Sequence, residues 1–451
     1  MAEINAMGKI PEKVIIPLRQ HNGTDCESLV KKGDQVLVGQ KIGECSSDDC
    51  ACVHSSVCGE VVSIEDAPNP SGNKVKSVII EPAEADQCVD FVPIKDIGNV
   101  DLINVLKEAG IVEHYGDPTH RVLSTEGQDI DTVIIDATSS EWIGGHFDTP
   151  VQYGTRMLES LRLLMKAAGA SKGAIVLRND DRDSINVFDD LEYEGKRMDV
   201  GSLVGNRHIG YYLKDQKSDI VVVSHDRIYG KDKLSLFTHH VTGKKVPFHC
   251  APANVGVAIC SVKSAKALYD VLHEGKPYIE TVVSVSGKVK VPQRILVKIG
   301  TTFRDVIEAC GGYMGEPAKL IANGAITGVA QYTDEVPVTK ATTAITVQGP
   351  DEVHHDEPIA CIHCALCVDV CPVELVPSRL AALADQGRFD ECRQMNIVNC
   401  IECGQCAAVC PSKIHILQLI RYSKESINRA YEDITPKESS NLKLGCSCGS
   451  V

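Results

Sequence analysis

The chain is 451 residues long, contains 20 cysteines and carries a formal net charge of −15. The length predicts three or four domains, and the acidic balance argues against nucleic acid and anionic lipid as binding partners. No apolar run approaches the ~20 residues of a transmembrane span, and the first residues lack a signal-peptide core. We therefore expect a cytoplasmic protein, free or held peripherally in a complex at the inner face of the membrane, whose cysteines are metal ligands or redox thiols.

The first 92 residues are expected to form a barrel-sandwich hybrid. Short strands separated by turn residues are predicted from about residue 10 to about residue 90. The segments 30–43 and 57–62 resemble the two half-repeats of biotinyl and lipoyl carrier domains. No carrier lysine stands at the predicted hairpin tip, which holds cysteines within the segment 45–52 instead.

Residues 97–275 alternate predicted strands and helices, which is typical of a Rossmann-like α/β domain with a largely parallel sheet. Apolar residues at helical spacing predict a helix over 157–168, and a second helix is predicted over 257–272. Apolar runs, mostly rich in β-branched residues, predict buried strands at 131–136, 173–177 and 220–223.

Two further domains and a tail are predicted after this region. An alternating segment from residue 281 and a short helix at 303–309 predict a small β-grasp domain over 279–348. Residues 352–432 hold two cysteine runs among helix-forming residues, which predicts a helical ferredoxin-type domain. The polar residues 433–451 are expected to be a mobile tail. The predicted fold class is therefore multidomain, with α/β and α+β parts.

The two cysteine runs carry the strongest chemical signal. Both have the spacing C-x2-C-x2-C-x3-C-P that bacterial ferredoxins use for [4Fe–4S] clusters, in which the fourth thiolate ligates the partner cluster. We therefore assign Cys361, Cys364, Cys367 and Cys410 to one cluster, and Cys400, Cys403, Cys406 and Cys371 to the other. Zinc sites need only paired C-x2-C knuckles, and disulfides do not suit a chain without a secretory signal.

Several segments resemble the C subunit of the Rnf electron-transport complex. They are IPLRQH at 16–21, VHSSV at 53–57, PANVGV at 252–257, VPVTK at 336–340, CIECG at 400–404 and CPSKI at 410–414. The order of the four predicted domains resembles that family over nearly the whole chain. The resemblance implies an α/β domain like that of the flavoprotein subunit of respiratory complex I, which binds FMN and takes a hydride from NADH.

The flavin loop of that family is degenerate in this chain. The family pattern G-x-G-G-A-G-F-P-T exposes backbone N–H groups that cradle a phosphate. The matching segment 110–119 retains Gly110, Gly116, Pro118 and Thr119. Glu113 and Asp117 place carboxylates where the phosphate would lie, which is electrostatically unfavourable. The second flavin segment of the family is replaced by residues 136–142, so we do not expect FMN and interpret the domain as a retained scaffold.

A third group of cysteines lies on or near the predicted hairpin tip. Its members are Cys45, Cys50, Cys52 and Cys58. Four thiols within 14 residues suggest an additional redox or metal site, either a dithiol pair, a zinc site or another cluster. The alternative is a set of thiols without special chemistry, which is also the interpretation of Cys26.

The main hypothesis is an iron–sulfur electron-transfer protein of RnfC-like type, for which we assign no catalytic residue. It would relay electrons through two [4Fe–4S] clusters from a flavoprotein or ferredoxin to an acceptor reductase, and the family resemblance suggests an amino-acid reductase such as proline reductase. One alternative is the NADH-oxidising, FMN-containing subunit of a membrane-bound Rnf ion-pumping complex. Another is a structural adaptor with non-functional clusters. Whether the chain is an electron carrier or an oxidoreductase subunit is left open.

Overall fold

The computed structural model describes most of the chain as two compact units. The residues that it does not describe are 1–4, 9–10, 85–86, 95–97, 99, 126, 139–149, 190, 194, 204–207, 217, 226–233, 248–249, 326–327, 354–356 and 435–451. One unit contains Met1–Asp226 and Pro252–Val353, and the other contains Arg227–Ala251 and His354–Val451. The tail predicted over 433–451 therefore lies outside the described residues from position 435 onward.

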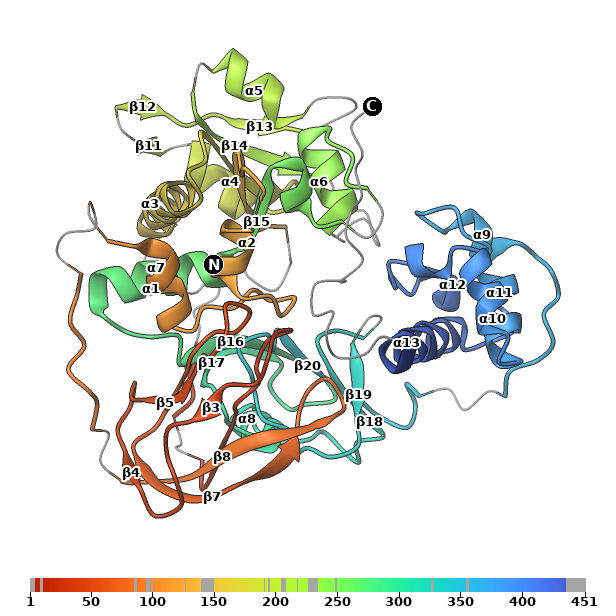
Figure 1. Cartoon of the computed structure of the whole chain (residues 1–451), viewed down its shortest axis with the longest axis horizontal. Helices are drawn as coiled ribbons and strands as arrows, with labels where there is room; N and C mark the ends of the chain where they lie inside the picture. The colour runs from red at the N-terminus through yellow and green to blue at the C-terminus, as the bar shows by residue number, and fades with distance from the viewer. Residues whose placement is uncertain are drawn as a thin grey trace. The chain divides into compact units, whose positions relative to one another are not determined.

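Two small antiparallel sheets form the N-terminal domain (Figure 1). The first has the order β2-β8-β7-β4, with β2 (Val14–Pro17), β8 (Lys74–Pro82), β7 (Gly59–Pro68) and β4 (Gln35–Val36). The second has the order β3-β5-β6, with β3 (Glu27–Ser28), β5 (Lys41–Glu44) and β6 (Val53–His54). Buried side chains from both sheets, including Ile16, Ile42 and Val78, form one core. The barrel-sandwich prediction is confirmed.

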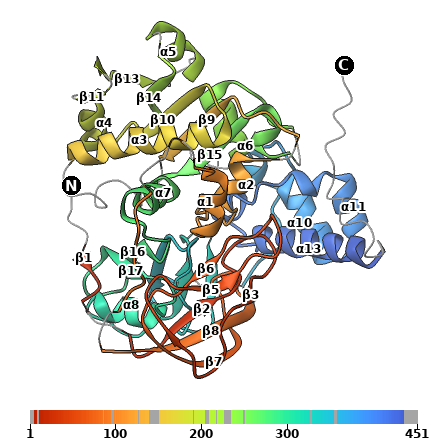
Figure 2. The same cartoon turned by 60° about the vertical axis from the view of Figure 1, so that its left-hand side comes forward.

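A five-stranded parallel sheet with the order β13-β14-β10-β9-β15 forms the α/β domain. Its strands are β13 (Val200–Ser202), β14 (Ile220–His225), β10 (Lys172–Arg178), β9 (Thr132–Ala137) and β15 (Val257–Ser261). The helices of this domain include α1 (Leu102–Glu108), α2 (Thr119–Leu123), α3 (Pro150–Ala168), α4 (Arg182–Asp189), α5 (Ile209–Asp215), η1 (Pro252–Val255) and α7 (Val262–Glu274). The long helix α3 runs along the sheet (Figure 2) and buries Leu158, Leu161 and Leu164 against it. The three strand predictions are confirmed in this sheet.

The helix predicted over 257–272 is wrong for its first five residues. They form the edge strand β15, all of whose residues are buried. Ser261 then ends the strand and caps α7, because its side chain accepts a hydrogen bond from the Ser264 N–H while the Ser264 hydroxyl lies within hydrogen-bonding distance of the Ser261 N–H. This capping box satisfies free N–H groups at the start of α7, so the helix begins at Val262.

A six-stranded sheet with the order β1-β17-β16-β20-β18-β19 forms the β-grasp domain. Its strands are β1 (Asn5–Ala6), β17 (Gln293–Lys298), β16 (Glu280–Gly287), β20 (Ala344–Gln348), β18 (Lys319–Ala322) and β19 (Val329–Gln331). The predicted helix is present as α8 (Phe303–Ala309), and it packs Phe303, Val306 and Ile307 into the core of this domain.

Short helices surround the cysteine runs in the second unit (Figure 1). They are α9 (Leu366–Asp369), α10 (Pro377–Asp385), α11 (Phe389–Gln394), η2 (Ile397–Asn399), α12 (Gln405–Ala408) and the longer α13 (Ile416–Ile434). The same unit contains α6 (Leu234–Thr242). Helix α13 packs against α10 and α11 around Leu380, Cys392 and Ile420. The predicted helical character of this domain is confirmed, and no helix in the described part of the chain has the length and apolarity needed to cross a membrane.

Candidate functional site

The two ferredoxin-type cysteine runs fold into loops with the same backbone path. Three residues in each loop have left-handed φ angles: 56°, 62° and 55° at His363, Ala365 and Glu374, and 56°, 76° and 54° at Glu402, Gly404 and Lys413. Each residue of the second loop stands 39 positions after its counterpart, as Cys400 does after Cys361. Five of these six residues are not glycine, and each such residue costs about 1–2 kcal/mol in this region. The repetition indicates that both loops meet the same structural requirement.

The first set of assigned cysteines lines one cavity. Three of its members come from the first loop and Cys410 comes from the end of the second, and together they border a space of about 30 Å³. The remaining wall includes Pro411, Ser412 and Ile416. The structure therefore brings Cys361, Cys364, Cys367 and Cys410 together.

The second set of assigned cysteines is also brought together. The pKa of Cys406 is raised to about 12, first by burial and then by the negative charges of Cys400, Cys403 and, more weakly, Cys371. Thiolates affect one another in this way only when they are close. Cys371, from the first loop, also packs in the same core cluster as Cys400 and Cys406 of the second loop. All eight side chains can offer thiolates, the usual ligands of [4Fe–4S] clusters.

The two sets differ in their surroundings. Cys361 and Cys364 are exposed, whereas Cys400 and Cys403 are half-buried. On the second loop, Glu402 pairs with two cations of α13, Arg421 at 3.1 Å and Lys424 at 2.5 Å. These cations outweigh the effect of burial and lower the pKa of Glu402.

Hydrogen bonds and charges also reach the cysteines directly. The Lys424 ammonium donates to the Cys400 carbonyl at 3.1 Å, and the Glu402 N–H donates to the Cys400 sulfur at 3.4 Å. The Leu375 N–H donates to the Cys371 sulfur at 3.3 Å. Donors and positive charges near thiolates stabilise the reduced form of an iron–sulfur centre.

The predicted flavin loop is a closed hairpin. Val112 pairs with Pro118 across it, and the Glu113 N–H donates to the Asp117 carbonyl at 2.8 Å. Glu113 itself is fully buried. Its carboxylate accepts hydrogen bonds from the Thr119 hydroxyl at 2.9 Å and from the Ser261 N–H at 2.7 Å. Burial raises the pKa of Glu113 to about 7 against the opposing effect of these hydrogen bonds.

The two glycines of this loop face protein atoms. Gly110 and Gly116 have φ angles of 70° and 97°. A Cβ atom on Gly110 would lie 2.1 Å from the Cys52 carbonyl oxygen, and one on Gly116 would lie 2.8 Å from the Asn22 amide oxygen. Both glycines are therefore packed against the barrel-sandwich domain and do not form a cradle for an FMN phosphate. Of the second predicted flavin segment, 136–142, only residues up to 138 are described.

A polar crevice of about 400 Å³ lies beside this loop. Its walls include residues 114–116 of the loop, 19–23 and 69–71 of the barrel-sandwich domain, and Thr339 of the β-grasp domain. The volume is within the range of about 300–1,000 Å³ that is usual for small-molecule sites. The sequence did not indicate this crevice, because its walls come from three domains that are far apart along the chain.

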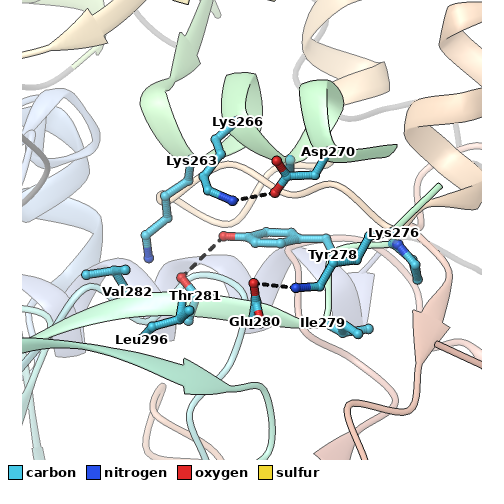
Figure 3. Close-up of a pocket in the computed structure, with 12 residues that line it drawn as sticks. Lys263, Lys266, Asp270, Lys276, Tyr278, Ile279, Glu280, Thr281, Val282 and Leu296 are labelled. Atoms are coloured by element: carbon cyan, nitrogen blue, oxygen red, sulfur yellow. Dashed lines mark hydrogen bonds and ion pairs between the residues drawn. The ribbon is translucent and has the colours of Figure 1, made fainter. Parts of the chain in front are cut away.

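A smaller cavity of about 20 Å³ is bordered by α7 and β16 (Figure 3). This volume suits about one water molecule. Four of its charged side chains form two ion pairs, Lys266 with Asp270 and Lys276 with Glu280. The ammonium group of Lys263, which also lines the cavity, donates a hydrogen bond to the Thr342 carbonyl at 2.6 Å. Because these groups already have partners and the space is small, this cavity is not a substrate site.

The cysteines near the hairpin tip do not form a single group. Cys45 and Cys50 form a disulfide, with their Cα atoms 5.6 Å apart. The sulfur of Cys26 joins them, so that the three sulfur atoms all lie within 4.8 Å of one another. Strand pairing brings Cys26 to this site. Glu27 of β3 is opposite Glu44 of β5, so the adjoining residues Cys26 and Cys45 lie close together. No local sequence pattern therefore indicates that Cys26 belongs to the group.

The other two predicted members lie apart from this trio. The Cys52 sulfur groups with carboxylate oxygens of Glu44 and Glu108, again within 4.8 Å. The Cys58 sulfur accepts a hydrogen bond from the Gln87 N–H at 3.3 Å. The structure therefore brings together two of the four predicted thiols and adds a third.

Four domain families match successive parts of the chain. They are the RnfC barrel sandwich hybrid domain at residues 2–85, the Nuo51 FMN-binding domain at 106–270, the SLBB domain at 282–330 and the 4Fe-4S dicluster domain at 360–414. These matches agree with the four domain types described above.

Relatives match over almost the whole length. The chain is 50% identical over 440 residues to the C subunit of the ion-translocating oxidoreductase complex of Methanosarcina acetivorans, covering 97% of both chains. It is 32% identical to the C subunit of the Na(+)-translocating ferredoxin:NAD(+) oxidoreductase complex of Acetobacterium woodii, covering 93% of this chain and 92% of the relative. Among solved structures, an NAD+-reducing [NiFe]-hydrogenase aligns with a TM-score of 0.46 and 14% identity, covering 77% of this chain and 70% of the other. The domain matches and the full-length identity together establish that the chain belongs to the RnfC family, which comprises the C subunits of ion-translocating oxidoreductase complexes.

Proposed function

We propose that this chain transfers electrons as the C subunit of an Rnf-type ion-translocating oxidoreductase complex. The observation that carries the proposal is the pair of matching loops that bring together two crossed sets of four cysteines. The thiolates of Cys361, Cys364, Cys367 and Cys410 would hold one [4Fe–4S] cluster, and those of Cys400, Cys403, Cys406 and Cys371 the other. When bound, the clusters supply one-electron transfer.

The chain's own residues make the two cluster sites unequal. Lys424 and Arg421 bring positive charge to the second site, while Glu402 neutralises part of it. Cys361 and Cys364 are exposed at the first site, so a redox partner can approach it more closely. We therefore assign the exchange of electrons with a partner to the first site.

The partner is proposed to be another subunit of such a complex. The relatives are named as subunits of ion-translocating complexes, which favours the Rnf-complex alternative over the amino-acid reductase expected from the sequence. We propose that contacts with those subunits hold the chain at the membrane surface.

A second version of the function adds NADH oxidation at FMN in the α/β domain. It is favoured by the match of residues 106–270 to an FMN-binding domain and by the name of the Acetobacterium woodii relative. FMN is therefore a candidate cofactor, which corrects the expectation from the sequence that it is absent. The described loop still gives no phosphate cradle, because Glu113 and the packed glycines occupy it.

Anaerobic purification of the full chain tests both versions. We expect roughly eight irons per chain, four for each cluster, and an electron paramagnetic resonance signal that appears on reduction. Cys403→Ser should lose iron, whereas Cys392→Ser should not, because buried Cys392 lies outside both runs and its thiol faces the Leu380 carbonyl. Half the expected iron in the wild-type protein would contradict the proposal. Stoichiometric FMN with NADH-dependent dye reduction would establish the second version, and clusters that resist reduction would indicate a structural adaptor.

A further inference from the structure

The sulfur atoms of Cys26, Cys45 and Cys50 form a compact group in the barrel-sandwich domain. Cys26 and Cys50 are buried, with 4% and 0% of their surfaces exposed, while Cys45 is half-buried. The Cys26 thiol donates to the Ala51 carbonyl at 3.3 Å, and the Ala51 N–H donates to His21 at 3.1 Å. The backbone at Ala51, next to Cys50, is therefore held on one side by Cys26 and on the other by His21.

The spacing of the three sulfurs fits a single metal ion. Zinc–thiolate bonds are about 2.3 Å long, which places tetrahedrally arranged sulfurs about 3.8 Å apart. The three sulfurs all lie within 4.8 Å of one another, so small side-chain movements would bring them to that geometry. A cubane cluster holds its thiolates further apart, because an iron atom stands between each thiolate and the cluster body. None of the eight ferredoxin-type cysteines, all of which are described, belongs to a group this tight.

A buried ammonium group lies next to these thiols. Lys340 is 1% exposed, and its ammonium donates to the Cys52 carbonyl at 2.8 Å. No carboxylate in the described part of the chain pairs with it. Burial lowers the pKa of Lys340, and Cys26 and Cys52 are the thiols near enough to act on it electrostatically. Burial also raises the pKa of Cys26 to about 11, so Cys26 is a neutral thiol while no metal is bound.

The charge balance is consistent with a metal. Three thiolates around a divalent ion carry a net charge of about −1, which one ammonium group neutralises. Burying an unpaired ammonium costs several kcal/mol, so an anionic centre beside Lys340 supplies the missing counter-charge. Thiolate ligands favour zinc among the common divalent ions.

We propose that Cys26, Cys45 and Cys50 bind one Zn²⁺ ion through their thiolates when this protein is reduced, with water in the fourth position. The disulfide between Cys45 and Cys50 and the metal site are alternative states of the same sulfur atoms. A dithiol reductant supplies the two electrons and two protons that open the disulfide and is itself oxidised to a disulfide, and Zn²⁺ then displaces the protons of the three thiols. The site lies in a different domain from the ferredoxin-type cysteines, and the proposal does not depend on the proposed electron-transfer function.

Metal analysis of the full chain, purified anaerobically with a reductant and dialysed against micromolar Zn²⁺, tests the proposal. We expect about one zinc per chain in the wild-type protein, as the three-ligand site predicts. Cys26→Ser and Cys45→Ser should lower the zinc content at least fivefold.

Cys88→Ser is the matched control, because Cys88 is an exposed thiol outside the group. Iron content, measured on the same samples, should stay constant in all four proteins. Wild-type protein without zinc, or Cys45→Ser with undiminished zinc, would overturn the proposal.

Zinc X-ray absorption on the wild-type protein gives a test that needs no variant to fold. Sulfur scatterers at about 2.3 Å with an average count near three are expected. A shell of only nitrogen and oxygen would overturn the proposal. Loss of iron would bear on the electron-transfer function alone, since zinc and iron are counted separately.

Discussion

The buried carboxylate of Glu113 accepts a hydrogen bond from the Ser261 N–H at 2.7 Å and so joins the loop 110–119 to the first turn of α7. The same carboxylate accepts a second hydrogen bond, from the Thr119 hydroxyl, at 2.9 Å. A side chain of the loop thus fills the position that an anionic ligand takes in glycine-rich loops, next to the start of a helix. These two hydrogen bonds hold the loop closed.

Replacing Glu113 with glutamine should change how stability depends on pH. Burial raises the pKa of Glu113 to about 7 from its ordinary 4.5. The folded state therefore binds more protons than the unfolded state between these values, and its stability falls as the pH rises through this window. At 1.36 kcal/mol per pKa unit the cost reaches at most about 3 kcal/mol above pH 7. Glu113→Gln should thus be about 1–3 kcal/mol more stable than wild type at pH 8, with the difference vanishing near pH 5.

Urea unfolding of both proteins under anaerobic conditions at the two pH values measures this difference. Asp117→Asn is a suitable control, because Asp117 is a half-buried acid of the same loop. An equal difference between wild type and Glu113→Gln at pH 5 and pH 8 would show that the Glu113 charge is not its cause.

Lys424→Met should lower the reduction potential of the second cluster site. Lys424 donates to the Cys400 carbonyl and pairs with Glu402, so its removal takes away a positive charge and leaves Glu402 less neutralised. A unit charge within 10 Å at an effective dielectric constant of 20 is worth roughly 1.5–2 kcal/mol. After solvent screening we expect a decrease of roughly 30–90 mV for one electron.

A redox titration followed by electron paramagnetic resonance measures this shift. Arg388→Met serves as the control, because Arg388 contacts Glu391 and Gln386 of the same domain. Identical potentials in all three proteins would exclude the proposed role of Lys424.

The crossed assignment of cysteines makes a separate prediction. In the Lys424→Met background the two clusters are distinguished by the shifted potential of one of them. Cys371→Ser should remove or convert the shifted cluster, although Cys371 belongs to the first loop, and Cys410→Ser should affect the unshifted cluster. The opposite pattern in the same titration would mean that each loop ligates its own cluster.

The left-handed residue Ala365 provides a test of backbone strain. Its φ angle is 62°, and its counterpart in the second loop is Gly404. Ala365→Gly should stabilise the loop by about 0.5–1 kcal/mol, because glycine adopts this conformation without steric cost but loses more entropy on folding. Ala365→Val should destabilise it by more than about 1 kcal/mol. The rate at which visible cluster absorbance is lost in urea should fall for the glycine variant and rise for the valine variant; the reverse order would contradict the strain argument.

Features that depend on neighbouring residues could be predicted from the sequence. The cysteine runs set the two loops by local spacing, and the structure brings together both predicted sets of thiols. The buried strands β9, β10 and β14 follow from continuous apolar runs in a parallel sheet. The edge strand β15 is predicted as helix instead, because a short apolar run that adjoins a true helix has no distinct period.

Features that depend on distant residues could not be predicted. Cys26 reaches Cys45 only through the pairing of β3 with β5. Lys340 meets the Cys52 carbonyl across two domains, 288 positions along the chain. The sequence pattern predicts that Glu113 repels a phosphate from an open loop, whereas the structure buries it as part of a closed one. Each of these relationships is set by tertiary structure, which local patterns do not encode.

The exchange of one cysteine between the two loops has a consequence for how the protein matures. In the proposed assignment, Cys371 and Cys410 each serve the site built mainly by the other loop, so neither loop can complete a four-thiolate site alone. Loading one cluster positions a ligand for the next, so insertion should be cooperative. A partly matured population would then consist mainly of empty and fully loaded chains, with few chains carrying a single cluster.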